Sequence, residues 1–560
     1  MRYHLLATDY DGTLAARGEV SEETAGAIER LRATGRRTVL VTGRIASDLS
    51  QIFDRLELFD RVVAENGATL LEPGPGKERV LAAPPPEAFT RALAARGVPF
   101  ARGRVVVATR EPHHHAALEV IREMGLELSV VFNKGSVMIL PNGVSKATGL
   151  AAALADLALT PHEVVALGDA ENDHLLLSTA ECGVAVANAL PPLKEAADLV
   201  TEGARGEGVR QVVAMLERDD LSSADPARRD VPLSAGGTGA AFRPGRDRVL
   251  IAGGSGSGKT TAATAVIERF LDRGYQLCVI DPEGDYDDFE GLTAVGATGR
   301  PPGSEEVLSL LSDPQVSLSV NLLGVKMNDR PAWFAGLLPR LEELRSRTGR
   351  PHLLVADEAH HLFPREGQVA SAAWPADPGA VLLVTLSPGR IAPVVLRSLT
   401  GVVTIGEEAE EGLSEFLLAT GRPELHAPPR RSGEALSFWV LRPQEVRPLE
   451  IEPPRATRHR HRRKYAHGDM REKAFRFRGR DGRLDLRARN LGVFLELAQG
   501  VDEDTWRFHL ENGDVDGWLR DALKDPDVAR EVEALRHASV PASESLRRVR
   551  ELLGERYMLE

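Results

Sequence analysis

The chain has 560 residues and a formal net charge of −13, with 42% apolar and 27% charged residues. This length predicts several domains, and the acidic balance argues against a surface that coats nucleic acid throughout. We find no apolar run long enough to cross a bilayer, and no signal-peptide core before Asp9. Cys182 and Cys278, the only cysteines, are expected to be buried strand residues. These features predict a cytoplasmic protein without a membrane partner.

Two segments run from an apolar strand into a glycine-rich turn and a helix. They are HLLATDYDGTL near residue 5 and RVLIAGGSGSGKTT near residue 250. Each is typical of an α/β unit with a parallel sheet. The stretch 218–246, rich in Ser, Ala, Gly and Pro, is predicted to be a linker. We therefore expect an α/β domain over 1–217, a second one over 247–453, and a small, mostly helical module over 454–560.

The first domain carries acidic, hydroxyl and basic residues in four motifs. DYDGTL places Asp9 and Asp11 at a strand end, where both carboxylates can surround one reacting group. A carboxylate nucleophile needs a counter-cation and a second carboxyl group that moves a proton. The later motifs VLVTGR, GVSKATGL and VVALGDAENDHLLL suit the same chemistry and contain Thr42, Lys146, Asp169, Asn172 and Asp173.

In this order and at these intervals, the four motifs resemble those of the haloacid-dehalogenase superfamily, in particular its Cof-like and sugar-phosphatase branch. The resemblance covers about residues 1–217 and implies a Rossmann-like core. It implies that Asp9 attacks phosphorus to form an aspartyl phosphate, and that Asp11 protonates the leaving oxygen and later activates water. Thr42 would bind the phosphoryl oxygens, and Lys146 would balance the charge on Asp9 and the phosphate.

The same resemblance implies a magnesium ion. Asp169 would bind it together with the Asp9 carboxylate and the Asp11 carbonyl. Asn172 and Asp173 would complete or brace this set of ligands. An anion that attacks an anion needs a metal and a lysine to cancel the repulsion, so the physical chemistry agrees with these roles.

A cap is expected between the threonine and lysine motifs, over about residues 83–140, because members of this branch carry an insertion there. The alternation in RVVVATREP and LSVVFNKGSVMILPNG predicts a small α/β fold for it. A cap covers the phosphate and sets the substrate, and a compact one favours small phosphomonoesters such as phosphoglycolate or sugar phosphates. Asn66, in the ENGA segment typical of the branch, is either a pocket residue or a turn residue.

A second site is predicted by GGSGSGKT, which follows the strand RVLIAG and precedes a helix. This is the spacing of a phosphate loop, in which backbone N–H groups surround a β-phosphate and the lysine reaches the β and γ oxygens. The expected ATP-binding residues are Gly253, Gly256, Gly258, Lys259, Thr260 and Thr261, of which Thr260 would hold magnesium. Asp357 would hold a magnesium-bound water, and Glu358 would polarise the attacking water, because both follow the strand in HLLVADEAHH.

Together with the phosphate loop, QLCVIDPEGDYDDF and DEAHHLFP resemble the HerA/FtsK-type ATPases over about residues 247–450. The resemblance implies ATP hydrolysis coupled to movement, in a homo-oligomeric ring that acts on DNA or protein. The chain departs from the family at Leu386, where a glutamine usually senses the γ-phosphate. ATP binding is therefore a firmer expectation than fast turnover. Arg390 and Arg397 are either solvated or act on a neighbouring subunit's site.

The C-terminal module opens on the basic segments RHRHRRK and FRFRGRDGRLDLRAR, in which Asp481 and Gly482 would form a hairpin turn. The arginines would suit binding to nucleic acid, with Phe477 stacking on bases. Alternatively, the segments form a solvated linker and the exposed face of a hairpin. Short amphipathic helices follow, with Asn490 as a cap. We expect an interaction or regulatory module.

Three functions of the whole chain stay open. The leading one is a magnesium-dependent phosphatase for a small phosphorylated metabolite, fused to an ATP-binding domain. The second is a nucleic-acid end-processing phosphatase and kinase, although Asp357 and Glu358 suit an ATPase better than a kinase. The third is a DNA-associated switch or scaffold that binds ATP without hydrolysing it, which Leu386 favours.

Overall fold

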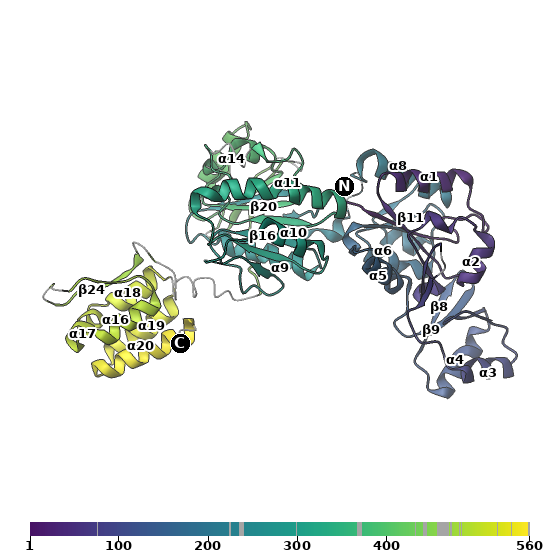
Figure 1. Cartoon of the computed structure of the whole chain (residues 1–560), viewed down its shortest axis with the longest axis horizontal. Helices are drawn as coiled ribbons and strands as arrows, with labels where there is room; N and C mark the ends of the chain where they lie inside the picture. The colour runs from purple at the N-terminus through teal and green to yellow at the C-terminus, as the bar shows by residue number, and fades with distance from the viewer. Residues whose placement is uncertain are drawn as a thin grey trace. The chain divides into compact units, whose positions relative to one another are not determined.

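The computed structural model describes residues 1–74, 77–222, 224, 226–234, 240–297, 299–366, 372–431, 433–440, 445–455, 470, 473–480, 482, 484–523, 525–538 and 540–557. These residues form two compact units, Met1–Pro454 and Arg455–Glu560. The first unit contains two α/β domains and the second is mostly helical, so the expected fold class is confirmed (Figure 1). Among the described helices, none has the length and apolar character needed to cross a bilayer.

The core of the first domain is an eight-stranded sheet formed by β1 (Leu5–Asp9), β2 (Arg37–Val41), β3 (Arg61–Ala64), β4 (Thr69–Glu72), β5 (Lys77–Val80), β10 (Val164–Gly168), β11 (Cys182–Ala185) and β12 (Leu199–Val200). The strand order is β12-β11-β10-β1-β2-β3-β4-β5, and the strands from β12 to β3 run parallel. Leu5 and Ala7 face one core cluster and Leu6 faces another, so β1 is buried on both sides. Its carboxyl end, at Asp9, therefore lies at the centre of the sheet.

Helices from both halves of this domain cover the two faces of the sheet. Ile28 of α1 (Glu22–Ala33) and Val212 of α8 (Gly206–Asp219) belong to the same core cluster as Leu6. Leu150 of α5 (Lys146–Asp156) and Leu176 of α6 (His174–Thr179) belong to the cluster on the other face. This layering leaves the carboxyl edge of the parallel strands as the place where polar side chains gather.

A small α/β cap lies between β5 and α5, as expected for the fold. It consists of α3 (Glu87–Ala95), β6 (Ala101–Arg102), β7 (Val107–Arg110), α4 (His114–Met124), β8 (Leu128–Asn133) and β9 (Ser136–Pro141). The strands form an antiparallel sheet in the order β6-β7-β9-β8. Phe89 and Val120 of the helices pack on Val107 and Ile139 of the sheet, which gives the cap a core of its own.

The second domain contains a nine-stranded sheet formed by β15 (Arg248–Gly253), β16 (Leu277–Asp281), β17 (Thr293–Val295), β18 (Leu318–Asn321), β19 (Leu353–Ala356), β20 (Val381–Thr385), β21 (Gly401–Ile405), β22 (Ala435–Trp439) and β23 (Arg447–Leu449). The order is β17-β18-β16-β19-β20-β15-β21-β22-β23, with only β22 and β23 antiparallel to their neighbours. Its helices are α9 (Lys259–Asp272), α10 (Ser304–Ser312), α11 (Arg330–Thr348), α13 (Pro393–Arg397) and α14 (Ala409–Ala419). Cys278 in β16 and Cys182 in β11 are both buried strand residues, which confirms the expectation for the two cysteines.

Part of the segment predicted to be a linker is folded. Within it, β13 (Val231–Pro232) pairs with β14 (Ala241–Phe242). Val231 and Phe242 are buried in the core of the second domain, where the Phe242 ring meets the Phe270 ring edge-on with centroids 5.2 Å apart. Two-residue strands leave no hydrophobic period in the sequence, so periodicity alone does not reveal them.

Buried polar contacts join the amino ends of the two sheets within the first unit. Glu163, before β10, lies 2.8 Å from Nε2 of His352, which precedes β19. Glu181, before β11, accepts a hydrogen bond of 3.1 Å from the hydroxyl of Tyr275, which precedes β16. These contacts lie at the strand ends opposite to those that carry the polar motifs.

The second unit packs a short hairpin against helices. It is formed by β24 (Phe475–Phe477), β25 (Leu486–Ala488), α16 (Leu491–Gly500), α17 (Glu503–Glu511), α18 (Asp514–Asp521), α19 (Pro526–His537) and α20 (Ala542–Tyr557). Asn490 caps α16 by accepting a hydrogen bond of 2.8 Å from Val493 N–H, as expected. Phe477 is fully buried and stacks on Phe494, so the expectation that it stacks on bases is wrong. RHRHRRK (458–464) and Asp481 lie outside the described residues.

Candidate active site

Three side chains from distant motifs meet at the carboxyl end of β1. Lys146 is the first residue of α5, and the Ser145 side chain caps this helix. The Lys146 ammonium donates to Asp9 Oδ1 and to Asp173 Oδ1, at 2.6 Å in each case. The Lys146 side chain is 0% exposed, so its charge is neutralised by these carboxylates rather than by water.

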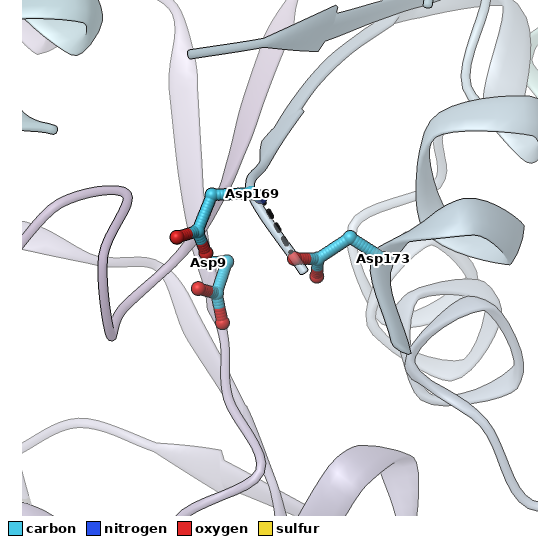
Figure 2. A group of neighbouring side chains, drawn as sticks. All are labelled: Asp9, Asp169 and Asp173. Atoms are coloured by element: carbon cyan, nitrogen blue, oxygen red, sulfur yellow. Dashed lines mark hydrogen bonds between the residues drawn. The ribbon is translucent and has the colours of Figure 1, made fainter. Parts of the chain in front are cut away.

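Asp169 follows β10 and lies beside Asp9 (Figure 2). The short turn η4 (Glu171–Asp173) brings Asp173 back toward it. Asp173 Oδ2 accepts from the backbone N–H groups of Asp169, at 2.9 Å, and Ala170, at 3.0 Å, and Figure 2 draws the first of these. Because both Asp173 oxygens are engaged, this residue braces the turn and holds Asp169 in place.

Carboxylate oxygens of Asp9, Asp169 and Asp173 lie within 4.8 Å of one another, and all three residues are buried. A set of oxygen donors suits a hard divalent cation such as Mg²⁺. Gly12 closes one side, because a Cβ atom there would lie 2.2 Å from Asp169 Oδ2. The residues present therefore fit the expected metal.

Asn172 and Asn66 contact each other next to this acidic group. Asn172 Nδ2 donates to Asn66 Oδ1 at 2.9 Å. Asn66 has a left-handed φ of 57° and is buried, so it is a turn residue whose side chain also contacts the site. Within the described part of the chain, Asn172 Oδ1 is buried without a hydrogen-bond partner. An oxygen in this state is suited to accept from a ligand or to bind a cation.

The Asp11 carboxylate pairs with Arg44. Arg44 Nε and Nη2 donate to its two oxygens at 2.6 and 2.7 Å. Thr42 is buried, and its Oγ1 accepts from Arg44 N–H at 3.1 Å. Val41 pairs with Asp9 across β2 and β1, which places Thr42 next to Asp9. The VTGR motif predicted a role for Thr42 but not for Arg44, although an arginine two residues after the threonine was the signal available.

Asn188 and Lys134 also contact Asp169 and were likewise missed. Asn188 Nδ2 donates to Asp169 Oδ2 at 3.1 Å and to Gly12 O at 2.8 Å. Lys134, in the turn between β8 and β9 of the cap, forms an ion pair with Asp169 Oδ2. Neither residue belongs to a motif with a spacing that would mark it in the sequence.

Burial and close charges control the ionisation of this group. Burial raises the pKa of Asp9; Lys146 opposes this shift and Asp173 adds to it. Burial lowers the pKa of Lys146, but Asp173 and Asp9 outweigh that effect, so the net shift is upward and the group stays charged. Burial also raises the pKa of Asp169, against the effect of Lys134. Added positive charge would favour the carboxylate form of Asp9.

The phosphate loop of the second domain runs from β15 into α9. Gly256 and Gly258 have φ values of 79° and 97°, which glycine adopts without strain. Gly253 is tightly packed, because a Cβ atom there would lie 2.5 Å from Ile405 O. Lys259, Thr260 and Thr261 open α9, whose free backbone N–H groups favour a bound anion.

Asp357 and Glu358 follow β19, and Glu358 faces this loop. Asp357 is buried, and its Oδ2 accepts from the Tyr286 hydroxyl at 3.1 Å. Glu358 Oε1 lies 3.9 Å from Lys259 Nζ. The φ of Glu358 is 42°, a left-handed value that non-glycine residues adopt at a cost and that is common at functional sites.

His360 is a further residue near this loop that sequence reasoning did not assign. Its Nδ1 lies 3.3 Å from Thr385 Oγ1 and 3.5 Å from Glu358 Oε2. Burial, together with His361 and Arg390, lowers the pKa of His360 to about 4, so the imidazole is neutral near pH 7. His360 thus lies beside Thr385, the residue before Leu386. Arg390 and Arg397 are exposed.

Comparison with known proteins identifies the first domain. Residues 6–83 and 111–213 match the family model of the haloacid dehalogenase-like hydrolases. A phosphoglycolate phosphatase from Methanothermobacter thermautotrophicus is 31% identical over 217 residues, which are 37% of this chain and 96% of that protein. The chain belongs to the haloacid dehalogenase-like hydrolase family through this domain. It is a phosphoric monoester hydrolase.

Two further matches illustrate the range of similarity. Phosphoglycolate phosphatase 2 of Saccharolobus solfataricus is 35% identical over 116 residues, which are 21% of this chain. The chain spans only 48% of the length of that relative. A solved structure of a haloacid dehalogenase-like hydrolase from Bacteroides thetaiotaomicron is 20% identical and covers 38% of this chain and 100% of its own, with a TM-score of 0.34.

The second domain has a match of its own. Residues 246–329 match the central domain of the helicase HerA, which agrees with the resemblance to HerA-type ATPases. This range includes the phosphate loop and the DPEGDY segment. The chain therefore joins a haloacid-dehalogenase-type phosphatase domain to a HerA-like domain.

Proposed function

We propose that the first domain hydrolyses a small phosphate monoester through a covalent intermediate on Asp9. The observation that carries this proposal is the buried contact of 2.6 Å between Lys146 and Asp9, beside the carboxylates of Asp169 and Asp173. A carboxylate can attack a phosphate only where positive charge offsets the repulsion between the two anions. Lys146 supplies part of that charge.

The proposed reaction has two steps. In the first, an Asp9 oxygen bonds to phosphorus and the ester P–O bond breaks, while Asp11 gives a proton to the leaving oxygen. In the second, Asp11 takes a proton from water, the water oxygen bonds to phosphorus, and the bond to Asp9 breaks to release inorganic phosphate. Asp11 must leave its ion pair with Arg44 to carry this proton. Thr42 would donate to the phosphoryl oxygens from beside Asp9.

Magnesium is the cofactor that we propose for this site. Asp9, Asp169 and the carbonyl of Asp11 would hold it, and Asn172 and Asp173 would complete or brace the set. When bound, the ion supplies positive charge that offsets the charge of the phosphoryl group. The oxygen-only donor set supports this choice.

The substrate that we propose is phosphoglycolate or a comparably small phosphorylated metabolite. Two observations support a small ester: the curated relatives above are named phosphoglycolate phosphatases, and the cap is compact. A cap of this size suits a ligand that it can enclose together with the phosphate.

The test uses the full-length chain with Mg²⁺ and a panel of phosphoglycolate, sugar phosphates and 3′-phosphorylated oligonucleotides. We expect turnover of small esters, and a loss of roughly 10³-fold or more in Asp9→Asn with ATP binding retained. Activity confined to oligonucleotides would favour an end-processing enzyme. A near-normal rate in Asp9→Asn would exclude Asp9 as the nucleophile.

For the second domain we propose ATP binding at the phosphate loop and hydrolysis assisted by Glu358. The supporting observation is that Glu358 faces Lys259 across the loop at 3.9 Å. ATPase rates of the wild type and of Glu358→Gln, with and without DNA, test this. We expect the variant to bind ATP but to turn over on the order of 10²-fold more slowly. If neither protein hydrolyses ATP but both bind it, a nucleotide-dependent switch is favoured instead.

A further inference from the structure

Lys134 lies at the tip of the hairpin formed by β8 and β9 of the cap. Asn133 pairs with Ser136, so the turn consists of Lys134 and Gly135 alone. Their φ values are 46° and 83°, both left-handed. Such turns favour Asn or Gly, and a residue with a long side chain costs about 1–2 kcal/mol in this conformation. A lysine at the first position therefore calls for a reason other than turn formation.

The hairpin tip lies over the phosphatase site. The Lys134 ammonium pairs with Asp169 Oδ2, and Lys134 N–H lies 3.4 Å from Glu171 Oε2. Further along β9, Met138 packs on the motif that contains Thr42, because a Cβ atom on Gly43 would lie 3.1 Å from Met138 Sδ. The cap thus brings a cation from outside the core domain to the edge of the acidic group.

Asp169 does not depend on Lys134 for its position. Its carboxylate also accepts from Asn188 Nδ2 at 3.1 Å and from Thr13 Oγ1 at 3.3 Å, and Asp173 holds its backbone N–H. Lys134 is also unlike Lys146, because 42% of its side chain is exposed whereas Lys146 is fully buried. A half-exposed ammonium on a cap turn, next to a carboxylate that is already fixed, is suited to contact a ligand.

We propose that Lys134 is a specificity-determining residue that binds a carboxylate on the substrate, so that the domain prefers short phosphate monoesters with a carboxylate close to the phosphate. This rests on the proposed phosphatase function and deepens it. Lys146 is fully buried between Asp9 and Asp173, so the carboxylate of such an ester needs a more exposed cation. Lys134 supplies it from the cap.

The decisive measurement compares two esters that differ in the carboxylate. Phosphoglycolate and ethyl phosphate are assayed with the full-length wild type, Lys134→Gln and Lys134→Arg. A charge-assisted hydrogen bond predicts that the ratio of kcat/KM for phosphoglycolate over ethyl phosphate falls about 10- to 100-fold in Lys134→Gln, mainly through KM. Lys134→Arg should recover most of the ratio, and Lys77→Gln, at an exposed lysine of β5, should leave it unchanged.

A binding measurement separates this proposal from the proposed function. Calorimetry with 3-phosphonopropionate and propylphosphonate, which cannot be hydrolysed as esters, reports carboxylate recognition without turnover. We expect Lys134→Gln to weaken only the carboxylated ligand. An equal loss for both ligands, or no loss for either, overturns the role of Lys134. Selective binding without turnover of any ester would retain Lys134 as a carboxylate-binding residue and contradict the phosphatase proposal instead.

Discussion

The two candidate sites of the first unit hold their lysines in different ways. Lys146 is fully buried and lies 2.6 Å from each of two carboxylates. Lys259 lies 3.9 Å from Glu358, beyond hydrogen-bond distance, in a loop shaped by glycines with left-handed φ. The first site is organised by side chains that neutralise one another, and the second by backbone that leaves N–H groups for an anion.

This difference predicts that Lys146 contributes to the stability of the fold and that Lys259 contributes mainly to ligand binding. Removing one member of a buried ion pair leaves the partner charge uncompensated, whereas removing a lysine from a phosphate loop mainly removes a contact to the ligand. The same substitution at the two lysines should therefore have different consequences. The following experiments test or refine that contrast, from the largest expected effect to the smallest.

The substitution Lys146→Met should have the largest effect. It leaves the Asp9 and Asp173 carboxylates buried without their cation, so we expect a loss of roughly 3–5 kcal/mol in the free energy of unfolding. Phosphatase activity should fall on the order of 10³-fold, as charge stabilisation is lost. Chemical denaturation and ester hydrolysis measure the two effects. Lys77→Met is the control at an exposed lysine, and unchanged stability of Lys146→Met would contradict the contrast.

The matching substitution Lys259→Met should weaken ATP binding by about 10- to 100-fold, the range expected for a charge-assisted contact to phosphate. Calorimetric titration with ATP measures this. We expect a change in unfolding free energy of less than about 1 kcal/mol, because the ion pair of Lys259 with Glu358 spans 3.9 Å, beyond hydrogen-bond distance, whereas those of Lys146 span 2.6 Å. Phosphoester hydrolysis should stay at the wild-type rate. Destabilisation as large as that of Lys146→Met would remove the distinction between the sites.

Gly12 and Gly18 offer a matched pair, since both have a φ of 85°. Alanine at either position would introduce backbone strain of about 1–2 kcal/mol. Only at Gly12 would the new Cβ atom meet Asp169 Oδ2, at 2.2 Å, whereas no atom lies within 4 Å at Gly18. We expect the Mg²⁺ concentration for half-maximal phosphatase activity to rise about tenfold in Gly12→Ala alone. The same rise in Gly18→Ala would assign the effect to strain.

Glu181→Gln, at the contacts between the two sheets, should leave both the phosphatase and the ATPase activity unchanged at neutral pH. Burial raises the pKa of Glu181, but His162 and Arg2 outweigh it and lower the pKa from 4.5 to about 2. The carboxylate therefore adds stability above pH 4.5 that is lost as the pH falls toward 2. Between pH 5 and pH 3 the free energy of unfolding should fall by about 2 kcal/mol more in the wild type than in the variant. Acid unfolding curves of the two proteins measure this. A changed rate at either site would show that the sites are coupled.

Much of the candidate site was predictable because its motifs are contiguous. DYDGTL and GGSGSGKT each lie where a strand ends, so strand, turn and phosphate chemistry are encoded within about ten residues. The pairing of β1 with β2 and β10 then brings Thr42 and Asp169 to the edge that carries Asp9. The segment 218–246 was harder to interpret, because its short strands acquire an apolar partner only when Phe242 meets Phe270.

The sequence by itself determined the α/β class and the residue types at both phosphate-binding edges, because these depend on local periodicity and spacing. Only the tertiary structure decided that Arg44 pairs with Asp11 and that Phe477 is a core residue. It also decided that Lys134 of the cap contacts Asp169 of the core domain. Such contacts depend on how sheets, helices and cap pack against one another, and no local spacing encodes that packing.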